Sequence, residues 1–133
     1  MTIAEFHKLE GRKNRGKAAA SEHDLQVGCV NVFRLLYPEK AHMLMAIPNG
    51  GFRTQKTAVL MKREGVVSGV PDMFLAVARK GYHGLWIEMK NGKAGRLSDN
   101  QKEMIALLKT EGYACVVCRT LDEFITIIRD YLE

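Results

Sequence analysis

Two carboxylates and a lysine lie where the chain is expected to enter and leave a β-hairpin. Asp72 ends a Gly-Val-Pro-Asp turn over 69–72, and Glu88 and Lys90 lie two positions apart in a later apolar run. Side chains alternate along a strand, so Glu88 and Lys90 share one face. Paired carboxylates bind a hard divalent cation, and an ammonium beside them can face the same phosphate or water. The set predicts metal-dependent phosphodiester hydrolysis.

The hairpin is predicted from two short apolar runs, Met73–Ala78 and Leu85–Lys90, joined by a polar turn with two glycines. Antiparallel pairing with Ala78 near Leu85 places Asp72 opposite the Lys90 end. The structural alternative is ordinary turn chemistry for the aspartate and a solvated strand face for the other two residues. That alternative is favoured for each residue alone, but the meeting of all three at one sheet end favours a site.

Length and composition are compatible with a soluble enzyme that binds a polyanion. The chain has 133 residues, 47% of them hydrophobic and 26% charged, which suits one globular domain. It has no apolar run long enough to span a membrane and no signal-peptide pattern, so a cytoplasmic protein is expected. The net charge of +5 suits DNA as a partner.

The three cysteines do not predict a disulfide framework. Cys115 and Cys118 resemble a C-x-x-C motif, but they lie in a strand-like run. Three positions along a strand place two side chains on opposite faces, so reduced thiols are expected rather than a zinc or redox site.

The predicted element order is α-β-α-β-β-α-β-α, which indicates an α/β fold. Residues 1–20 are rich in lysine and arginine and are predicted to form a flexible basic arm before a single domain over 21–133. Pro38 ends the first helix, and a Thr-Leu-Asp-Glu capping box opens the last. The predicted helices cover 21–37, 54–64, 98–110 and 120–132, and the predicted strands cover 43–47, 73–78, 85–90 and 113–118.

Glu22 lies in the first turn of the first helix, on the side of its apolar face, three residues before Leu25. An acid near a helix N-terminus is also favoured by the helix dipole alone. Its position on the core side nevertheless makes Glu22 the candidate for a third acidic residue at the site.

Five motifs occur in an order that resembles one nuclease family. They are Glu22 on an opening helix, Ile47-Pro48-Asn49-Gly50-Gly51-x-Arg53, Gly65-x-x-x-Gly69-x-Pro71-Asp72, Glu88-x-Lys90 and Ser98-x-x-Gln101. Over roughly Ser21 to Cys118 the chain resembles the VRR-Nuc family, the virus-type replication-repair nuclease branch of the PD-(D/E)xK superfamily. It resembles the short stand-alone form found in phages and bacteria, which implies the cytoplasm of a bacterial or phage-infected cell. The resemblance implies a restriction-endonuclease-like core, with a mixed central sheet flanked by helices, and divalent-metal cleavage of DNA. It also implies roles for Glu22, Asp72, Glu88, Lys90 and Gln101.

The expected cofactor is Mg²⁺ or Mn²⁺, because the candidate ligands are oxygens and no His/Cys cluster suggests zinc. Asp72 and Glu88 are the expected ligands, with the Met89 carbonyl as a further one and Glu22 acting through water or on a second ion. Lys90 would orient or activate the attacking water. Gln101 can also be explained as part of a capping box, but the resemblance favours a role in positioning Lys90 or a phosphate.

Two loops are candidates for DNA contacts. Asn49, Gly50 and Arg53 could bring backbone amides and a guanidinium to a phosphate, although the glycines also suit a plain strand-to-helix turn. Lys93 and Arg96 follow the proposed site, where solvated loop charges are the alternative.

The expected function is a structure-specific endonuclease that acts on branched or junction DNA in replication or repair. Two alternatives stay open: a non-catalytic nucleic-acid-binding module of the same fold, and a restriction or toxin-type nuclease acting on linear duplex. A homodimer is expected, because two copies would present two sites and the last predicted helix has a wide apolar face.

Overall fold

The structure is a computed structural model that describes Ala4, residues 21–48 and residues 54–133. The predicted basic arm, apart from Ala4, and the predicted DNA contacts Asn49, Gly50 and Arg53 lie outside these residues. No helix within the described ranges has the length and apolar character needed to cross a membrane.

A mixed sheet forms the centre of the described residues. Its order is β1-β2-β3-β4, in which β1–β2 and β2–β3 are antiparallel and β3–β4 is parallel. Parallel neighbours need a crossover connection, which the helix α4 (Asp99–Thr110) supplies between β3 and β4. The predicted mixed sheet is therefore confirmed. The strands are β1 (Leu44–Ala46), β2 (Met73–Leu75), β3 (Leu85–Met89) and β4 (Ala114–Cys118).

The predicted order of helices and strands is also confirmed, with one addition. The structure adds a 3₁₀ helix, η1, directly after Pro38 ends the first α-helix. Side-chain caps begin the main helices: Ser21, Thr54, Ser98 and Thr120 each accept a hydrogen bond from a backbone N–H three residues on. The helices are α2 (Glu22–Leu36), η1 (Pro38–Met43), α3 (Gln55–Arg63), α4 (Asp99–Thr110) and α5 (Leu121–Leu132).

The predicted hairpin register, with Ala78 near Leu85, is wrong. Leu75 pairs with Leu85, and Met73 pairs with Ile87. The β2 strand ends at Leu75, and two residues later the Tyr131 hydroxyl of α5 donates to the Val77 carbonyl, at 2.5 Å. The actual reversal is a tight turn over 79–82, whose central residues both have positive φ.

This correction moves the candidate aspartate closer to the candidate glutamate. Continuing the observed register by one pair places Asp72 opposite Glu88, whereas the predicted register placed it beyond Lys90. The three-residue shift therefore brings the two carboxylates to the same rung of the sheet.

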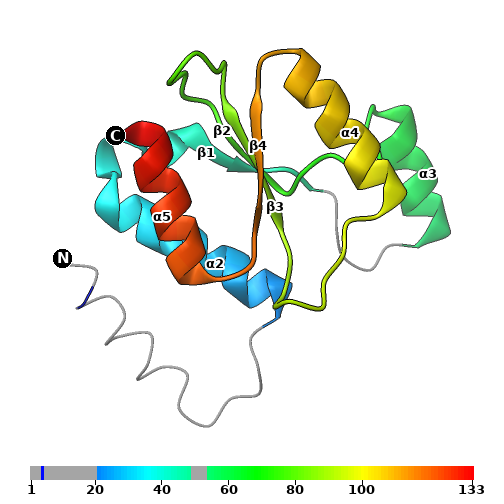
Figure 1. Cartoon of the computed structure of the whole chain (residues 1–133). Helices are drawn as coiled ribbons and strands as arrows, with labels where there is room; N and C mark the ends of the chain where they lie inside the picture. The colour runs from blue at the N-terminus through cyan, green and yellow to red at the C-terminus, as the bar shows by residue number, and fades with distance from the viewer. Residues whose placement is uncertain (1–3, 5–20, 49–53) are drawn as a thin grey trace, which may run out of the picture.

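The helices cover the sheet in two layers (Figure 1). Helices α2 and α5 pack together on one face, and α4 packs on the other face against β4. Leu85, Ile87 and Met89 are buried with α2 and α5 in the core. On the opposite face Trp86 stacks on Phe74, with ring centroids 4.4 Å apart. The predicted alternation along this strand is confirmed.

The cysteines are free thiols, as expected. Cys118 is buried on the α2 and α5 side beside Cys29, whereas the Cys115 sulfur faces the Ile105 carbonyl of α4. The two residues of the C-x-x-C pattern thus lie on opposite faces of the sheet and cannot act together.

The apolar face of α5 is used inside the chain. Phe124, Ile125, Ile128 and Tyr131 are buried in the core, and the remaining apolar residues of the helix pack against that core. The width of this face is explained by packing across the sheet and against α2. It therefore gives no argument for a dimer.

Candidate active site

Asp72 is held at the end of β2 by both neighbouring strands. The Ile47 N–H, just after β1, donates to the Asp72 carbonyl at 2.8 Å, and the Met89 N–H of β3 donates to the carboxylate Oδ2 at 2.7 Å. Pro71, immediately before it, is fully buried. The Gly-Val-Pro-Asp turn thus delivers one carboxylate directly onto the strand that carries the other.

Glu88 is a charged residue inside the protein, only 2% exposed. Its Oε1 accepts a hydrogen bond from Gln101 Nε2 at 3.0 Å and lies 3.7 Å from Lys90 Nζ. Its Oε2 is buried and has no hydrogen-bond partner among the described residues. Buried carboxylate oxygens normally have a hydrogen-bond partner, so an oxygen without one indicates a position where a ligand can bind.

The electrostatics of Glu88 fit a cation. Burial, and next the charge of Asp72, raise the pKa of Glu88 to about 8, against an opposing effect of Lys90. Two adjacent carboxyls in a poorly solvated place resist ionising together, and the charge of Lys90 alone does not offset this effect. A divalent cation with oxygen ligands would offset it, so the residues present fit Mg²⁺ or Mn²⁺.

Lys90 lies on the same face as Glu88, as its spacing predicts. Its N–H donates to the Cys118 carbonyl of β4 at 2.9 Å, and its side chain is only 13% exposed. The ammonium is therefore held beside the carboxylate pair rather than free in solvent.

Gln101 forms the capping box that the sequence suggested and also contacts Glu88, rather than Lys90 as the resemblance favoured. Its Oε1 accepts from the Ser98 N–H at 2.9 Å, which completes the capping box of α4, while its Nε2 donates to Glu88. The carbonyl end of the amide is used by the cap, so only its NH₂ end is left to act at the site. An NH₂ group needs an acceptor, so it faces Glu88 and not the Lys90 ammonium.

Glu22 lies at the edge of this group. It is exposed, at the start of α2, and its charge is the last of the effects that raise the pKa of Glu88. Within the described part of the chain, no three or more His, Cys, Asp or Glu residues are grouped to hold a metal ion. Glu22 thus stands near the carboxylate pair without joining it, a position from which it could act through water.

The loop that follows Lys90 is tied to the end of β4. Arg119 Nη1 donates to the carbonyls of Gly92 and Gly95, both at 2.7 Å. The predicted DNA contacts Lys93 and Arg96 are exposed on this loop. Sequence reasoning missed Arg119, because no motif contains it and only the pairing of β3 with β4 brings it beside the loop.

Gly69, which belongs to one of the five motifs, has a structural role in the turn before Asp72. It has a φ of +87°, and a Cβ at this position would lie 2.5 Å from the Asn100 carbonyl oxygen of α4. Close by, the Asn100 amide donates to Ser68 Oγ at 3.2 Å. The turn before Asp72 therefore docks on the same helical turn that carries Gln101.

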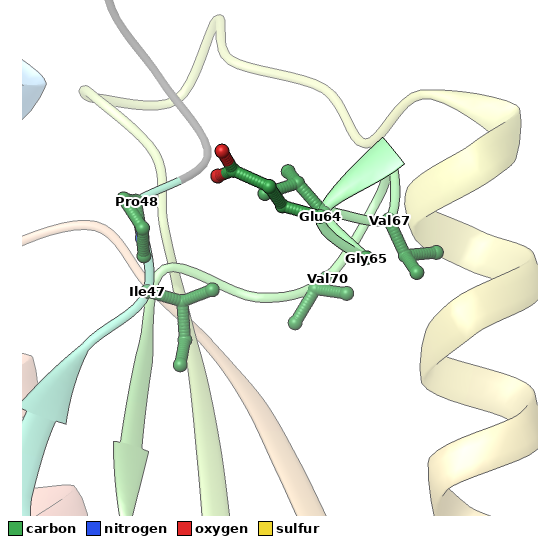
Figure 2. Close-up of a pocket in the computed structure, with 7 residues that line it drawn as sticks. Ile47, Pro48, Glu64, Gly65, Val67 and Val70 are labelled. Atoms are coloured by element: carbon green, nitrogen blue, oxygen red, sulfur yellow. The ribbon is translucent and has the colours of Figure 1, made fainter. Parts of the chain in front are cut away.

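A cavity of about 250 Å³ lies next to this turn (Figure 2). It is walled by residues at the end of β1 and by the segment between α3 and Asp72, and the Glu64 side chain reaches towards Pro48. None of the candidate site residues in the described ranges lines it. The lining residues are Ile47, Pro48, Glu64, Gly65, Val66, Val67 and Val70.

The fold and the site together define the class of protein. A mixed sheet between helical layers, with an Asp and a Glu-x-Lys set meeting at one sheet end, is the core of a restriction-endonuclease-like domain. The family model of the VRR-NUC domain matches residues 15–121, so the chain belongs to the VRR-NUC domain family, a nuclease-type family.

A solved structure supports the same assignment. A protein described as "VRR_NUC domain protein" is similar to this chain with a TM-score of 0.76 and 29% sequence identity. The match covers 87% of this chain and 91% of that one. A search of curated proteins gives no match.

Proposed function

We propose that this protein is a metal-dependent deoxyribonuclease that uses Mg²⁺ or Mn²⁺ to hydrolyse phosphodiester bonds. The observation that carries the proposal is the Asp72–Glu88 pair, in which a buried glutamate with a raised pKa keeps one oxygen unsatisfied beside a second carboxyl. A module that only binds DNA has no need of two adjacent acids near a phosphate, since they would repel it.

The chain would hold the metal mainly through oxygen ligands. Asp72 and Glu88 would be the direct ligands, with the Met89 carbonyl beside them and Glu22 acting through water. When bound, such a cation supplies Lewis-acid stabilisation of the phosphate charge and lowers the pKa of a water molecule.

The protein's own groups would then orient the reaction. Lys90 would hold the attacking water and neutralise charge on the phosphate, because its ammonium is kept close to Glu88. Gln101 would fix the Glu88 carboxylate through its Nε2, and Lys93 and Arg96 would contact the DNA backbone on the adjoining loop.

The substrate we propose is branched or junction DNA, cut by a structure-specific endonuclease in replication or repair. A homodimer would suit this substrate, because a two-fold axis would present two sites and a longer basic track. Asn49, Gly50 and Arg53 would add backbone contacts near the end of β1.

The chemistry is tested by Asp72→Ala, Glu88→Ala and Lys90→Ala. Each should reduce cleavage of branched DNA by about 100-fold or more, because each removes a group that meets the transition state. Binding of the same DNA in chelator should change little. Glu111→Ala and Lys109→Ala, at the far end of α4 from Gln101, are the matched controls and should cleave normally.

The same assay tests the metal and the substrate. Wild-type cleavage should need Mg²⁺ or Mn²⁺, be weak with Ca²⁺ and stop with chelator. Cleavage that resists chelator would contradict the carboxylate–metal proposal. Binding without cleavage under all metals would favour the binding module, and equal cleavage of unbranched duplex would favour the restriction or toxin-type alternative.

A further inference from the structure

Arg119 occupies a position that none of the motifs includes. Continuing the parallel register of β3 and β4 by one pair sets Arg119 next to Lys90, since Met89 pairs with Cys118. Its Nη1 carries two hydrogens, and the two carbonyls that it meets belong to Gly92 and Gly95. Hydrogen bonds from a charged donor are about twice as strong as neutral ones. The guanidinium therefore closes the loop over 91–97 onto the end of β4.

The closed loop lies against the candidate catalytic lysine. A Cβ built on Gly95 would lie 3.2 Å from Lys90 Cβ and 3.4 Å from its Cδ, so Gly95 lies beside the aliphatic part of that side chain and leaves little room for a side chain of its own. The other side of Lys90 is held by the bond from its N–H to the Cys118 carbonyl. The loop thus limits where the Lys90 ammonium can go.

We propose that Arg119 is a positioning residue for Lys90. It holds Gly95 against the lysine side chain and so keeps the ammonium beside Glu88, where their separation is 3.7 Å. The inference rests on the proposed function in that it takes Lys90 as the group that meets the reacting phosphate. Arg119 itself acts through the loop, since both hydrogens of Nη1 are directed to main-chain carbonyls.

The first test is a kinetic comparison of Arg119→Met, Arg119→Lys and the control Arg129→Met on branched DNA with Mg²⁺. Arg129 lies in the last turn of α5, far from the candidate site. The carbonyl of its neighbour Asp130 contacts Lys80, in the turn of the hairpin that lies at the opposite end from Glu88. Arg119→Met should lower kcat by about 10- to 100-fold with KM changed less than about twofold, because a misplaced catalytic group costs turnover.

Arg119→Lys should recover part of that loss, because an ammonium can reach a carbonyl but lacks the planar fork of the guanidinium. Arg129→Met should behave as wild type. A raised KM with unchanged kcat in Arg119→Met would overturn the proposal, because it would make Arg119 a DNA contact.

Gly95→Ala disturbs the same contact from the other side. Its methyl group would press on the Lys90 side chain, so kcat should fall although Arg119 is intact. The double variant with Arg119→Met should lose less than the product of the two single losses, since both act through one contact. If the kcat of the double variant instead fell by the product of the two single losses, Arg119 and Gly95 would not act through one contact.

A second readout needs no activity. Limited trypsin digestion in chelator, with peptides counted by mass spectrometry, reports cleavage after Lys93 and Arg96. Arg119→Met should speed cleavage at these two sites several-fold while cleavage after Lys102 and Lys109 in α4 stays at the wild-type rate. If the cleavage rate after Lys93 and Arg96 did not change, or if it rose equally at all four sites, Arg119 would not hold the loop. If wild-type protein cuts no DNA, the proposed function fails, and the trypsin result still decides whether Arg119 holds the loop.

Discussion

At the scale of single residues, Glu88 meets two opposing demands. It lies in the buried strand that builds the core, yet the proposed metal binding requires a negative charge on it. Without metal, the folded state keeps the proton because burial and Asp72 raise the pKa of Glu88 to about 8, whereas an unfolded glutamate ionises near its ordinary value of 4.5. Between these values the folded state binds more protons than the unfolded state. The free energy of unfolding must therefore fall as pH rises through this window.

Glu88→Gln should remove that dependence, because an amide keeps the shape of the side chain and cannot ionise. In chelator, the variant should be more stable than wild type by about 1–3 kcal/mol at pH 8 and nearly equal to it at pH 4.5. Urea unfolding at a series of pH values measures this. Glu103→Gln, an exposed change on α4, should keep the wild-type pH dependence. Equal slopes in wild type and Glu88→Gln would show that Glu88 ionises normally in the folded protein.

At the scale of elements, α4 links the fold to the site. The helix is the crossover between the parallel strands, and its first turn carries Gln101, which contacts Glu88. The turn before Asp72 docks on this same helical turn at Gly69. The N-terminus of α4 is therefore packed against the turn that precedes Asp72 and is hydrogen-bonded to Glu88.

Gly69→Ala tests this docking, with Gly65→Ala as its matched control. Both glycines have positive φ, at +87° and +102°, so both changes strain the backbone. Only at Gly69 would the new methyl meet backbone, 2.5 Å from the Asn100 carbonyl oxygen, while nothing lies within 4 Å at Gly65. Gly69→Ala should therefore cost about 1–3 kcal/mol more stability than Gly65→Ala and reduce cleavage further. Denaturant unfolding and kcat measure the two effects, and equal losses would contradict the docking.

At the scale of the whole molecule, the chain leaves some apolar side chains uncovered. Helix α3 buries no residue, and Val59 and Leu60 on it are 52% and 45% exposed. Because α5 is used inside the core, α3 now offers the better surface for the proposed homodimer.

Sedimentation equilibrium at micromolar concentration should detect a dimer that Val59→Glu weakens, because a charge would be placed in an apolar contact. Val27→Glu on α2, where the valine is 45% exposed, is the control and should leave association unchanged. A monomer at all concentrations, with and without DNA, would exclude the dimer and leave an enzyme that cuts one strand at each encounter.

The sequence by itself determined the order of the elements and which residues of the central strand share a face. These features depend on local physics: caps such as Ser21 and Ser98, the stop at Pro38, and alternation along residues 85–90 can each be recognised within a few positions. The same spacing placed Glu88 and Lys90 on one face, and the motif order identified the family.

Only the tertiary structure decided the hairpin register, the contact of Gln101 and the place of Arg119. Each depends on a partner outside the local segment: Tyr131 bonds the Val77 carbonyl beyond the end of β2, Glu88 on β3 accepts from the Gln101 amide, and β4 brings Arg119 to the loop after Lys90. Hydrogen-bond partners in a folded protein are chosen by which groups remain unsatisfied once the elements have packed. Local sequence does not contain that information.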